Sequence, residues 1–321
     1  MSKVLVVGDV HLSPRQPISR KDDYSETILN KIHTLGDIII KYKVEHIIFL
    51  GDLFNTRHMT LSYFIKCFQE FKRLDSLGAK LHTVVGNHDI YYNNESTMED
   101  SPMQLLFDSQ LFSNESFKDE NTYFTLVNYT TNTDSLPEVT EKNYYNVLVG
   151  HYFYKLGFGD TDHTITDEQA SRLGYHSYWL GHDHTPYEPI NNDHSHYSIH
   201  RPGSLSRGSS NTCQLHRNSI QLILFDSGTW DYEYINLPNV LSSKDVYKEN
   251  LLISKVDMFS LDESLQDLLK SFEFDNSSDI IETLNQIEID KEIKDKVLEY
   301  LSYEGIYQKE DTQWIQHRYS Y

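Results

Sequence analysis

Cysteine and long apolar runs are scarce in this 321-residue chain, and acidic residues far outnumber basic ones. The only two cysteines, Cys67 and Cys213, lie far apart in the sequence, which argues against a disulfide framework and favours a reducing cytoplasm. No apolar run approaches the roughly 18 residues of a membrane span. The chain begins directly with a strand-like segment, so we expect no signal peptide and no association with a membrane.

Lysine and arginine total 28 residues against 48 aspartates and glutamates, which gives a formal net charge of −20. This balance counts against a protein that holds nucleic acid through many phosphate contacts, because such contacts require Lys and Arg. Two features could offset it: bound divalent cations would bring positive charge to the site, and a partner subunit could supply a basic groove. The length allows one large domain and a small one.

Five short motifs in the first 184 residues carry side chains that bind metals, and most of them follow an apolar run typical of a strand. Loops at the ends of buried strands can converge on one point at the edge of a sheet, where α/β proteins bind ligands. Their aspartate, asparagine and histidine side chains suit a pair of borderline divalent metals. The motifs are Gly8-Asp9-Val10-His11, Gly51-Asp52, Gly86-Asn87-His88-Asp89, Gly150-His151 and Gly181-His182-Asp183-His184.

The apolar spacing of the first half predicts an α/β fold. Residues 23–42 and 61–77 have the periodicity of helices, the first with a capping box at its start and the second followed by Gly78 as a C-cap. The strand-like runs 4–7, 47–50 and 83–85 alternate with these helices along the chain, so we expect a mostly parallel sheet. From residue 122 onward short strands predominate, which predicts a second sheet stacked on the first, with helices on the flanks.

The composition changes near Pro238. We predict a metal-binding domain over residues 1–237 and a small, acidic C-terminal domain over residues 238–321, with amphipathic helices over 261–272, 278–287 and 290–301. Residues 238–321 hold 9 basic and 18 acidic side chains, a net charge of −9. This segment could cap the first domain or dock a partner, or its helices could simply present a solvated face.

The motifs predict how two metals would be held about 3.5–4 Å apart for phosphate chemistry. Asp52 is the natural bridge, because a carboxylate has two oxygens and would sit centrally after the second strand. Asp9 and His11 can reach one ion, while His182 and His184 can reach different ions. Asn87 offers a neutral oxygen. The neighbouring His88 is free to act on substrate, and Asp89 is expected to orient the loop through hydrogen bonds.

Taken together and in this order, the five motifs resemble the calcineurin-like metallophosphoesterase superfamily over about the first 210 residues. The resemblance implies that Asp9, His11, Asp52 and His184 bind one metal and that Asp52, Asn87, His151 and His182 bind the other. It also implies that His88 contacts the scissile phosphate and assists departure of the leaving oxygen.

Three segments are similar to one branch, the SbcD-type DNA repair nucleases and their phage-encoded relatives. They are Gly51-Asp52-Leu53-Phe54 with Arg57 behind it as a candidate substrate contact, residues 82–89, and Arg201-Pro202-Gly203-Ser204-Leu205-Ser206-Arg207. The resemblance implies a manganese-dependent enzyme of DNA repair, recombination or replication. Such enzymes are exonucleases on double-stranded DNA ends and endonucleases on single strands. They form homodimers and work with an SbcC-type coiled-coil ATPase, here in the host cytoplasm if the gene is phage-encoded.

The sequence departs from this branch at Asn55, where several relatives carry a histidine linked to exonuclease action. This departure concerns the exonuclease mode and not metal binding or phosphodiester hydrolysis. Two other functions also stay open. One is a stand-alone metallophosphoesterase for a nucleotide, a small molecule or a phosphoprotein, which the net charge favours. The other is a non-enzymatic scaffold, against which the complete ligand set argues. The aromatic residues that flank His151 could stack on bases or simply pack: Tyr144, Tyr145, Tyr152, Phe153 and Tyr154.

Overall fold

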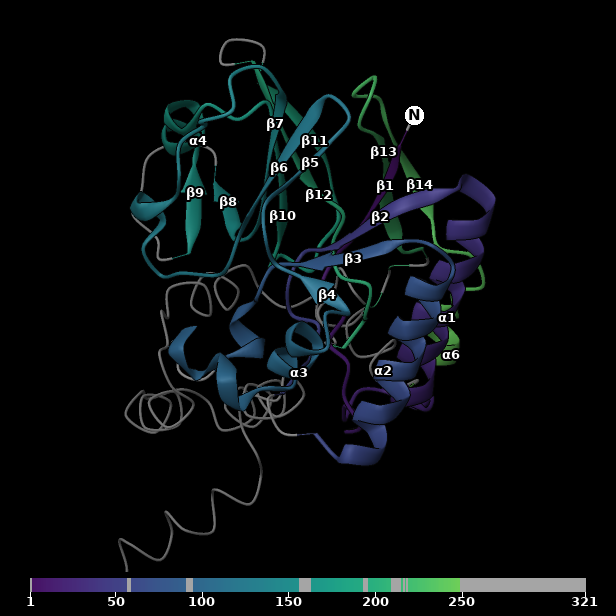
Figure 1. Cartoon of the computed structure of the whole chain (residues 1–321). Helices are drawn as coiled ribbons and strands as arrows, with labels where there is room; N and C mark the ends of the chain where they lie inside the picture. The colour runs from purple at the N-terminus through teal and green to yellow at the C-terminus, as the bar shows by residue number, and fades with distance from the viewer. Residues whose placement is uncertain are drawn as a thin grey trace, which may run out of the picture. The chain divides into compact units, whose positions relative to one another are not determined.

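Two six-stranded β-sheets packed face to face form the frame of the protein (Figure 1). The computed structural model describes residues 2–56, 59–90, 95–155, 163–192, 196–208, 215, 217 and 219–248. The three helices expected between residues 261 and 301 lie outside these ranges, as do Arg57 and Cys213.

The first sheet has the order β14-β13-β1-β2-β3-β4. Its strands β1 to β4 are parallel, while β13 runs antiparallel to β1 and β14 antiparallel to β13. The bounds are β1 Lys3–Val7, β2 Val44–Phe49, β3 Lys80–Thr83, β4 Phe112–Ser113, β13 Gln221–Asp226 and β14 Tyr232–Asn236.

The second sheet has the order β11-β12-β10-β7-β6-β5, and its central strands β12, β10, β7 and β6 are parallel. Strands β8 and β9 form a separate parallel pair. The bounds are β5 Phe117–Asp119, β6 Thr122–Val127, β7 Tyr145–His151, β8 Phe153–Lys155, β9 Thr164–Thr166, β10 Ser177–Gly181, β11 Tyr187–Asn192 and β12 Tyr197–Arg201.

Helices α1 and α2 cover the outer face of the first sheet (Figure 1). Helix α1 begins where the Asp23 side chain accepts a hydrogen bond from the Glu26 amide, and α2 is followed by Gly78 at φ +97°, as predicted. No helix within the described ranges is long and apolar enough to cross a membrane. The helices are α1 Tyr24–Tyr42, α2 Leu61–Ser76, α3 Pro102–Asp108, α4 Asp167–Leu173 and α6 Ser243–Val246, with 3-10 turns at Asn87–Asp89, Glu95–Asp100 and Thr133–Ser135.

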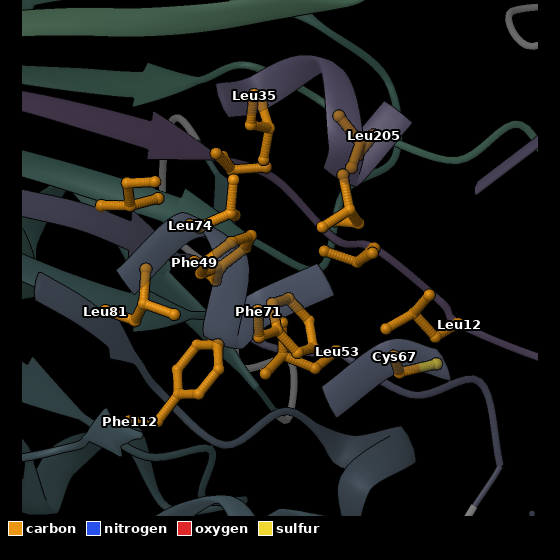
Figure 2. Close-up of a cluster of buried hydrophobic side chains, with 14 of the residues drawn as sticks. Leu12, Leu35, Phe49, Leu53, Cys67, Phe71, Leu74, Leu81, Phe112 and Leu205 are labelled. Carbon is orange, nitrogen blue, oxygen red and sulfur yellow. The ribbon is translucent and has the colours of Figure 1, made fainter. Parts of the chain in front are cut away.

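Successive side chains of the central strand β1 are buried on opposite faces of the sheet. In β1, Val4 and Val6 face the second sheet, where they pack with Trp179, while Leu5 and Val7 face the helices. A strand buried on both faces reads as a continuous apolar run, which is the pattern of Val4 to Val7. Figure 2 shows the helix-side core, in which side chains of α1 and α2 meet those of β2, β3 and β4.

The predicted sandwich of two sheets flanked by helices is confirmed. One expected strand was displaced: residues 83–85 were predicted to pair, but β3 ends at Thr83. The Val84 amide still donates to the Phe49 carbonyl of β2 (3.3 Å), while Val85 leaves the ladder, and both valines are buried. Residues 23–207 and 217–242, with the first sixteen, form one compact unit that contains both sheets. In a second unit, Leu215, Val246 and Tyr247 pack together. The boundary proposed near residue 238 stays a prediction.

Candidate metal centre

All the predicted metal-binding side chains follow strands of the two sheets and meet at one edge. Asp9 and His11 come directly after β1, and Asp52 follows β2. On the second sheet His151 ends β7, and the His182 to His184 segment follows β10. Because parallel strands end at the same edge, residues far apart in sequence arrive within a few ångströms of one another.

The first set of ligands forms a tight cluster. Asp9, His11, Asp52 and His184 each offer an atom within 4.8 Å of the others. The two ring nitrogens, Nε2 of His11 and Nε2 of His184, lie 2.8 Å apart, and His184 Nε2 lies 3.4 Å from Asp9 Oδ2. His11 Nε2 lies 3.7 Å from Asp52 Oδ2. This is the arrangement of atoms that converge on one cation.

The second set converges on His151 Nε2. That nitrogen lies 3.1 Å from Asn87 Oδ1, 3.1 Å from His182 Nδ1 and 3.3 Å from Asp52 Oδ2. Asp52 Oδ2 therefore faces both sets, as a bridging carboxylate would. Asp9 and Asp52 are each only 1% exposed, and two carboxylates buried this closely need compensating positive charge. The donor set and its burial fit two divalent cations.

His151 is held in the tautomer that a ligand needs. Its Nδ1 lies 2.8 Å from the Leu50 carbonyl oxygen, and since a carbonyl can only accept, Nδ1 carries the proton. Nε2 is then the nitrogen that faces the cluster and, once deprotonated, can bind a cation. A backbone carbonyl in this position is the usual support of a metal-binding histidine.

The electrostatics of the centre reflect burial and opposite charges at close range. Burial raises the pKa of Asp9. Burial acts to raise the pKa of Asp52 too, but His151 and His11 outweigh it and hold that pKa well below its usual range. Burial acts to lower the pKa of His151, yet Asp52 and Asp9 raise it to about 9. Burial and the charge of His151 lower the pKa of His182 to about 3. Within the cluster, the negative charge of the carboxylates and the positive charge of His151 thus stabilise each other.

Three of the predicted ligands adopt left-handed backbone conformations that are uncommon for residues other than glycine. The φ angles are 52° for His11, 45° for Asp52 and 79° for His182. The backbone amide of His11 donates to the carbonyl of Asp52 at 2.9 Å, which ties two of these loops together. Such strain concentrates at functional sites, where the surrounding structure maintains it.

Asp89 supports the loops without touching the cluster. Its two carboxylate oxygens accept hydrogen bonds from the amides of Phe54 (3.1 Å) and Gly86 (2.9 Å). Burial, followed by the charge of Asp52, raises the pKa of Asp89 to about 7. Its carboxylate therefore joins the loops that carry Asp52 and Asn87.

His88 lies at the exposed border of the centre. Its amide donates to Asp52 Oδ1 at 2.9 Å, and its ring is edge-on to the His11 ring at 5.0 Å. Its Nδ1 lies 3.0 Å from the backbone carbonyl oxygen of Asn55. That carbonyl would be present whatever the residue at position 55, so the contact leaves the role of the Asn55 side chain open.

The segment from Pro202 to Leu205 braces the metal-binding loops. The amide of Leu205 donates to the Asp9 carbonyl (2.8 Å), and that of Ser204 to the His184 carbonyl (3.1 Å). The guanidinium of Arg217, which is buried, donates to the carbonyls of Ser204 and Pro202. Sequence reasoning missed Arg217, because only its burial and its reach across the fold reveal its part.

The aromatic residues that flank His151 have different positions. Tyr144 and Tyr145 lie at the start of β7, at the opposite end from His151, and Tyr152 and Tyr154 are buried. Phe153 alone of the five is both exposed and in contact with the centre, with its ring centroid 4.1 Å from that of His182. Arg57, the candidate substrate contact, lies outside the described residues.

One family of known proteins matches most of this chain. Residues 2–225 match the family model of calcineurin-like phosphoesterases. A search of curated proteins finds no match. The fold is similar to crystal structures of a Thermus thermophilus protein and of a dimetal phosphatase from Danio rerio. The TM-scores are 0.45 and 0.44, with 10% sequence identity in each case. The alignments cover 74% of this chain and 99% of each of the other two.

Proposed function

The chain belongs to the calcineurin-like phosphoesterase family, a family of metal-dependent hydrolases, and from this premise we propose that it is a two-metal DNA nuclease. The observation that carries the proposal is the cluster around Asp52, whose Oδ2 faces two sets of ligands beside the exposed His88. Membership of the family implies metal-dependent hydrolysis. DNA as the substrate is our proposal.

In this mechanism the side chains have separate tasks. Asp9, His11, Asp52 and His184 would hold one divalent cation, and Asp52, Asn87, His151 and His182 the other. When bound, the cations polarise the phosphate and activate water. The Leu50 carbonyl keeps Nε2 of His151 available, and Asp89 keeps the loops of Asp52 and Asn87 in register.

His88 would act on the leaving oxygen. With Nδ1 engaged by the Asn55 carbonyl, Nε2 is the nitrogen that can reach substrate. An imidazolium there stabilises the charge that develops on the leaving oxygen, or donates a proton to it. The exposure of the ring makes this possible before any rearrangement of the loops.

DNA is supported by the likeness of residues 201–207 to SbcD-type nucleases. The same likeness is the basis of four further proposals. They are manganese as the metal, DNA repair, recombination or replication as the process, an SbcC-type ATPase as the partner and the cytoplasm as the compartment. The possible phage origin has no other support than that likeness. The acidic segment from residue 238 onward is proposed as a cap or docking domain for that partner.

A homodimer is part of the proposal. Leu61 and Ile65 lie one turn apart on α2 and are 71% and 46% exposed, which gives this helix an apolar patch facing outward. A second copy of the chain could cover it. Sedimentation of wild type beside Leu61→Lys tests this: we expect the variant to shift towards monomer, and an unchanged mass would exclude this patch as the interface.

A second candidate is a phosphoesterase for nucleotides, small molecules or phosphoproteins. The net charge of −20 favours it, because such substrates need fewer basic contacts than a duplex does. Preference for these substrates over DNA would decide in its favour.

The test is a digestion assay on duplex DNA labelled at the 3′ or the 5′ end, with manganese or magnesium, and with a generic phosphodiester in parallel. We expect wild type to shorten the DNA and both Asp52→Asn and His88→Ala to lose at least about 100-fold in rate. His33→Ala is the matched control, because His33 is an exposed histidine of α1 whose Nδ1 lies 3.0 Å from Glu70 Oε2 of α2. Cleavage of the generic ester with intact DNA would mean a missing partner or the second candidate, and addition of the ATPase separates these.

A further inference from the structure

We propose that Phe153 is the platform on which a nucleobase of the substrate stacks next to the scissile phosphate. The inference rests on the proposed function and deepens it, since it assigns the part of the substrate that the metal centre does not hold.

Phe153 is exposed where its neighbours are not. It lies in β8, in which side chains alternate between exposed, buried and exposed. The Phe153 side chain is 40% exposed, whereas Tyr152 is fully buried and Tyr154 is 8% exposed. An exposed phenyl ring between two buried tyrosines gains little from burial in the core, which suggests that something else covers it.

The ring lies directly beside the metal centre. Its centroid is 4.1 Å from that of His182, at an interplanar angle of 58°. Successive contacts run from His88 through His11 and Asp52 to His151 and His182. His88 therefore borders the first ligand set, through His11, and Phe153 borders the second, through His182. The proposal requires that a phosphate bound by both sets directs one of its substituents towards Phe153.

A nucleobase is the substituent that fits such a ring. Bases stack on aromatic side chains with little regard to sequence, and this attraction needs no positive charge. That matters in a chain with a net charge of −20, where contacts to phosphates are limited. Lys155 is exposed on the same face of β8, two residues on, and its ammonium could pair with a neighbouring phosphate of a polynucleotide.

A competing explanation is that Phe153 only shields His182. In that case its removal would weaken metal binding and would affect all substrates alike. The two explanations therefore differ in a measurable way: stacking concerns the base, and shielding concerns the metal.

The experiment uses dinucleotides, because each contains a single phosphodiester and the cleaved bond is known. Thymidylyl-thymidine is compared with two analogues in which a tetrahydrofuran residue replaces one nucleoside, on either side of the phosphate. KM and kcat are measured with manganese for wild type, Phe153→Ala, Phe153→Leu and Phe153→Trp. Dissociation constants of the same compounds and of manganese are measured by calorimetry.

We expect Phe153→Ala to weaken binding of the full dinucleotide, and to raise its KM, by roughly 5- to 150-fold. In wild type, only the analogue that lacks the stacked base should bind weakly. Phe153→Ala should change neither the affinity for that analogue nor the affinity for manganese. Phe153→Trp should retain the affinity. Phe153→Leu repeats the test in a variant that keeps more apolar volume. Tyr232→Ala removes an equally exposed aromatic residue of β14 and should change nothing.

Equal binding of full and abasic compounds by wild type would overturn the stacking proposal, as would an equal loss for all of them in Phe153→Ala. Failure of wild type to cleave any DNA would overturn the nuclease. The binding data would still decide the role of Phe153, so the two failures remain distinguishable.

Discussion

Gly86 has no side chain that could bind a metal, but the metal centre depends on it, because its position leaves no room even for a Cβ atom. A Cβ built on it would lie 2.1 Å from Asp52 Oδ1 and 2.4 Å from the Asp52 amide nitrogen, far inside van der Waals contact. Asp52 would have to move. We expect Gly86→Ala to lower the hydrolytic rate about 100-fold, since a displacement near 1 Å is enough for that. It should also lower the number of bound metals, measured by elemental analysis of the purified protein.

Gly78→Ala is the control for this variant. Gly78 has φ +97° at the end of α2, but a Cβ there meets nothing within 4 Å. Left-handed strain should cost about 1 kcal/mol of stability without any loss of metal. Full metal content in Gly86→Ala would show that the loop yields without moving Asp52, contrary to our account.

The residues of the centre were predictable from sequence because each occurs in a short motif after an apolar run. Arg217 was not, because nothing near it in the sequence indicates that its guanidinium reaches carbonyls at positions 202 and 204. Phe153 was one of five aromatic candidates, and its exposure together with its contact to the His182 ring distinguishes it from the four others. Local patterns thus identify residues that act through their own loop, and contacts across the fold identify the rest.

At the level of elements, the start of α1 depends on Asp23. Its Oδ1 accepts a hydrogen bond from the Glu26 amide at 3.1 Å, which satisfies a donor that the first turn leaves unpaired. We expect Asp23→Ala to lower the free energy of unfolding by about 1 kcal/mol and Asp23→Asn to lower it less. Urea denaturation measures both. Equal losses would mean that the carboxylate charge near the helix N-terminus, rather than the hydrogen bond, provides the stability.

Strand β12 carries a buried histidine whose ionisation should destabilise the sandwich. His200 is 1% exposed, with Nδ1 3.1 Å from the Tyr234 hydroxyl of β14 and Nε2 2.9 Å from Ser198 Oγ. Burial lowers the pKa of His200 to about 4. The neutral form is favoured when folded, so this stability is present above the unfolded pKa of about 6.5 and is lost as the pH falls towards 4.

The loss expected from His200 between pH 7 and pH 5 is on the order of 2 kcal/mol. Urea denaturation at both pH values, for wild type and for His200→Gln, isolates this contribution from that of the other histidines. The variant is expected to be less stable at pH 7 but to lose less on acidification. Parallel pH dependences for the two proteins would show that His200 titrates normally.

Element boundaries follow from periodicity where one face is exposed, and not where both are buried. The spacing of apolar residues in α1 and α2 identified those helices. Residues 83–85 were misassigned because Val84 and Val85 are fully apolar and buried, as strand residues would be. Yet the Val85 amide donates to the Asn128 side chain, and the Val85 carbonyl accepts from Tyr129. This departure from the sheet leads the chain to Asn87.

For the whole molecule, the order of strands was beyond sequence reasoning. Two stacked sheets were predicted, but β13 pairs with β1 across more than 200 residues, and no local pattern specifies that pairing. The convergence of the motifs was predictable because parallel strands end at the same edge whatever their order. The centre could therefore be proposed before the topology was known.

The net charge of −20 leads to a prediction about how DNA is held. Each phosphate neutralised by Lys or Arg contributes about −0.9 to the slope of log K against log salt on duplex DNA. If the metals and Phe153 provide most of the affinity, the slope for the isolated protein should be shallower than about −2. Affinities of His88→Ala for a labelled duplex between 50 and 200 mM salt, roughly the range over which such slopes are resolved, measure it without turnover.

Adding the proposed ATPase partner should steepen this slope, because the partner would supply a basic groove. A slope of about −5 for the isolated protein would instead mean that its 28 basic residues are gathered on one face despite the overall charge. In that case phosphate contacts would dominate, and loss of Phe153 would matter less on duplexes than on dinucleotides. The salt dependence of DNA affinity and the comparison of full with abasic dinucleotides can therefore be checked against each other. A shallow slope requires that stacking or the metals contribute strongly to the affinity.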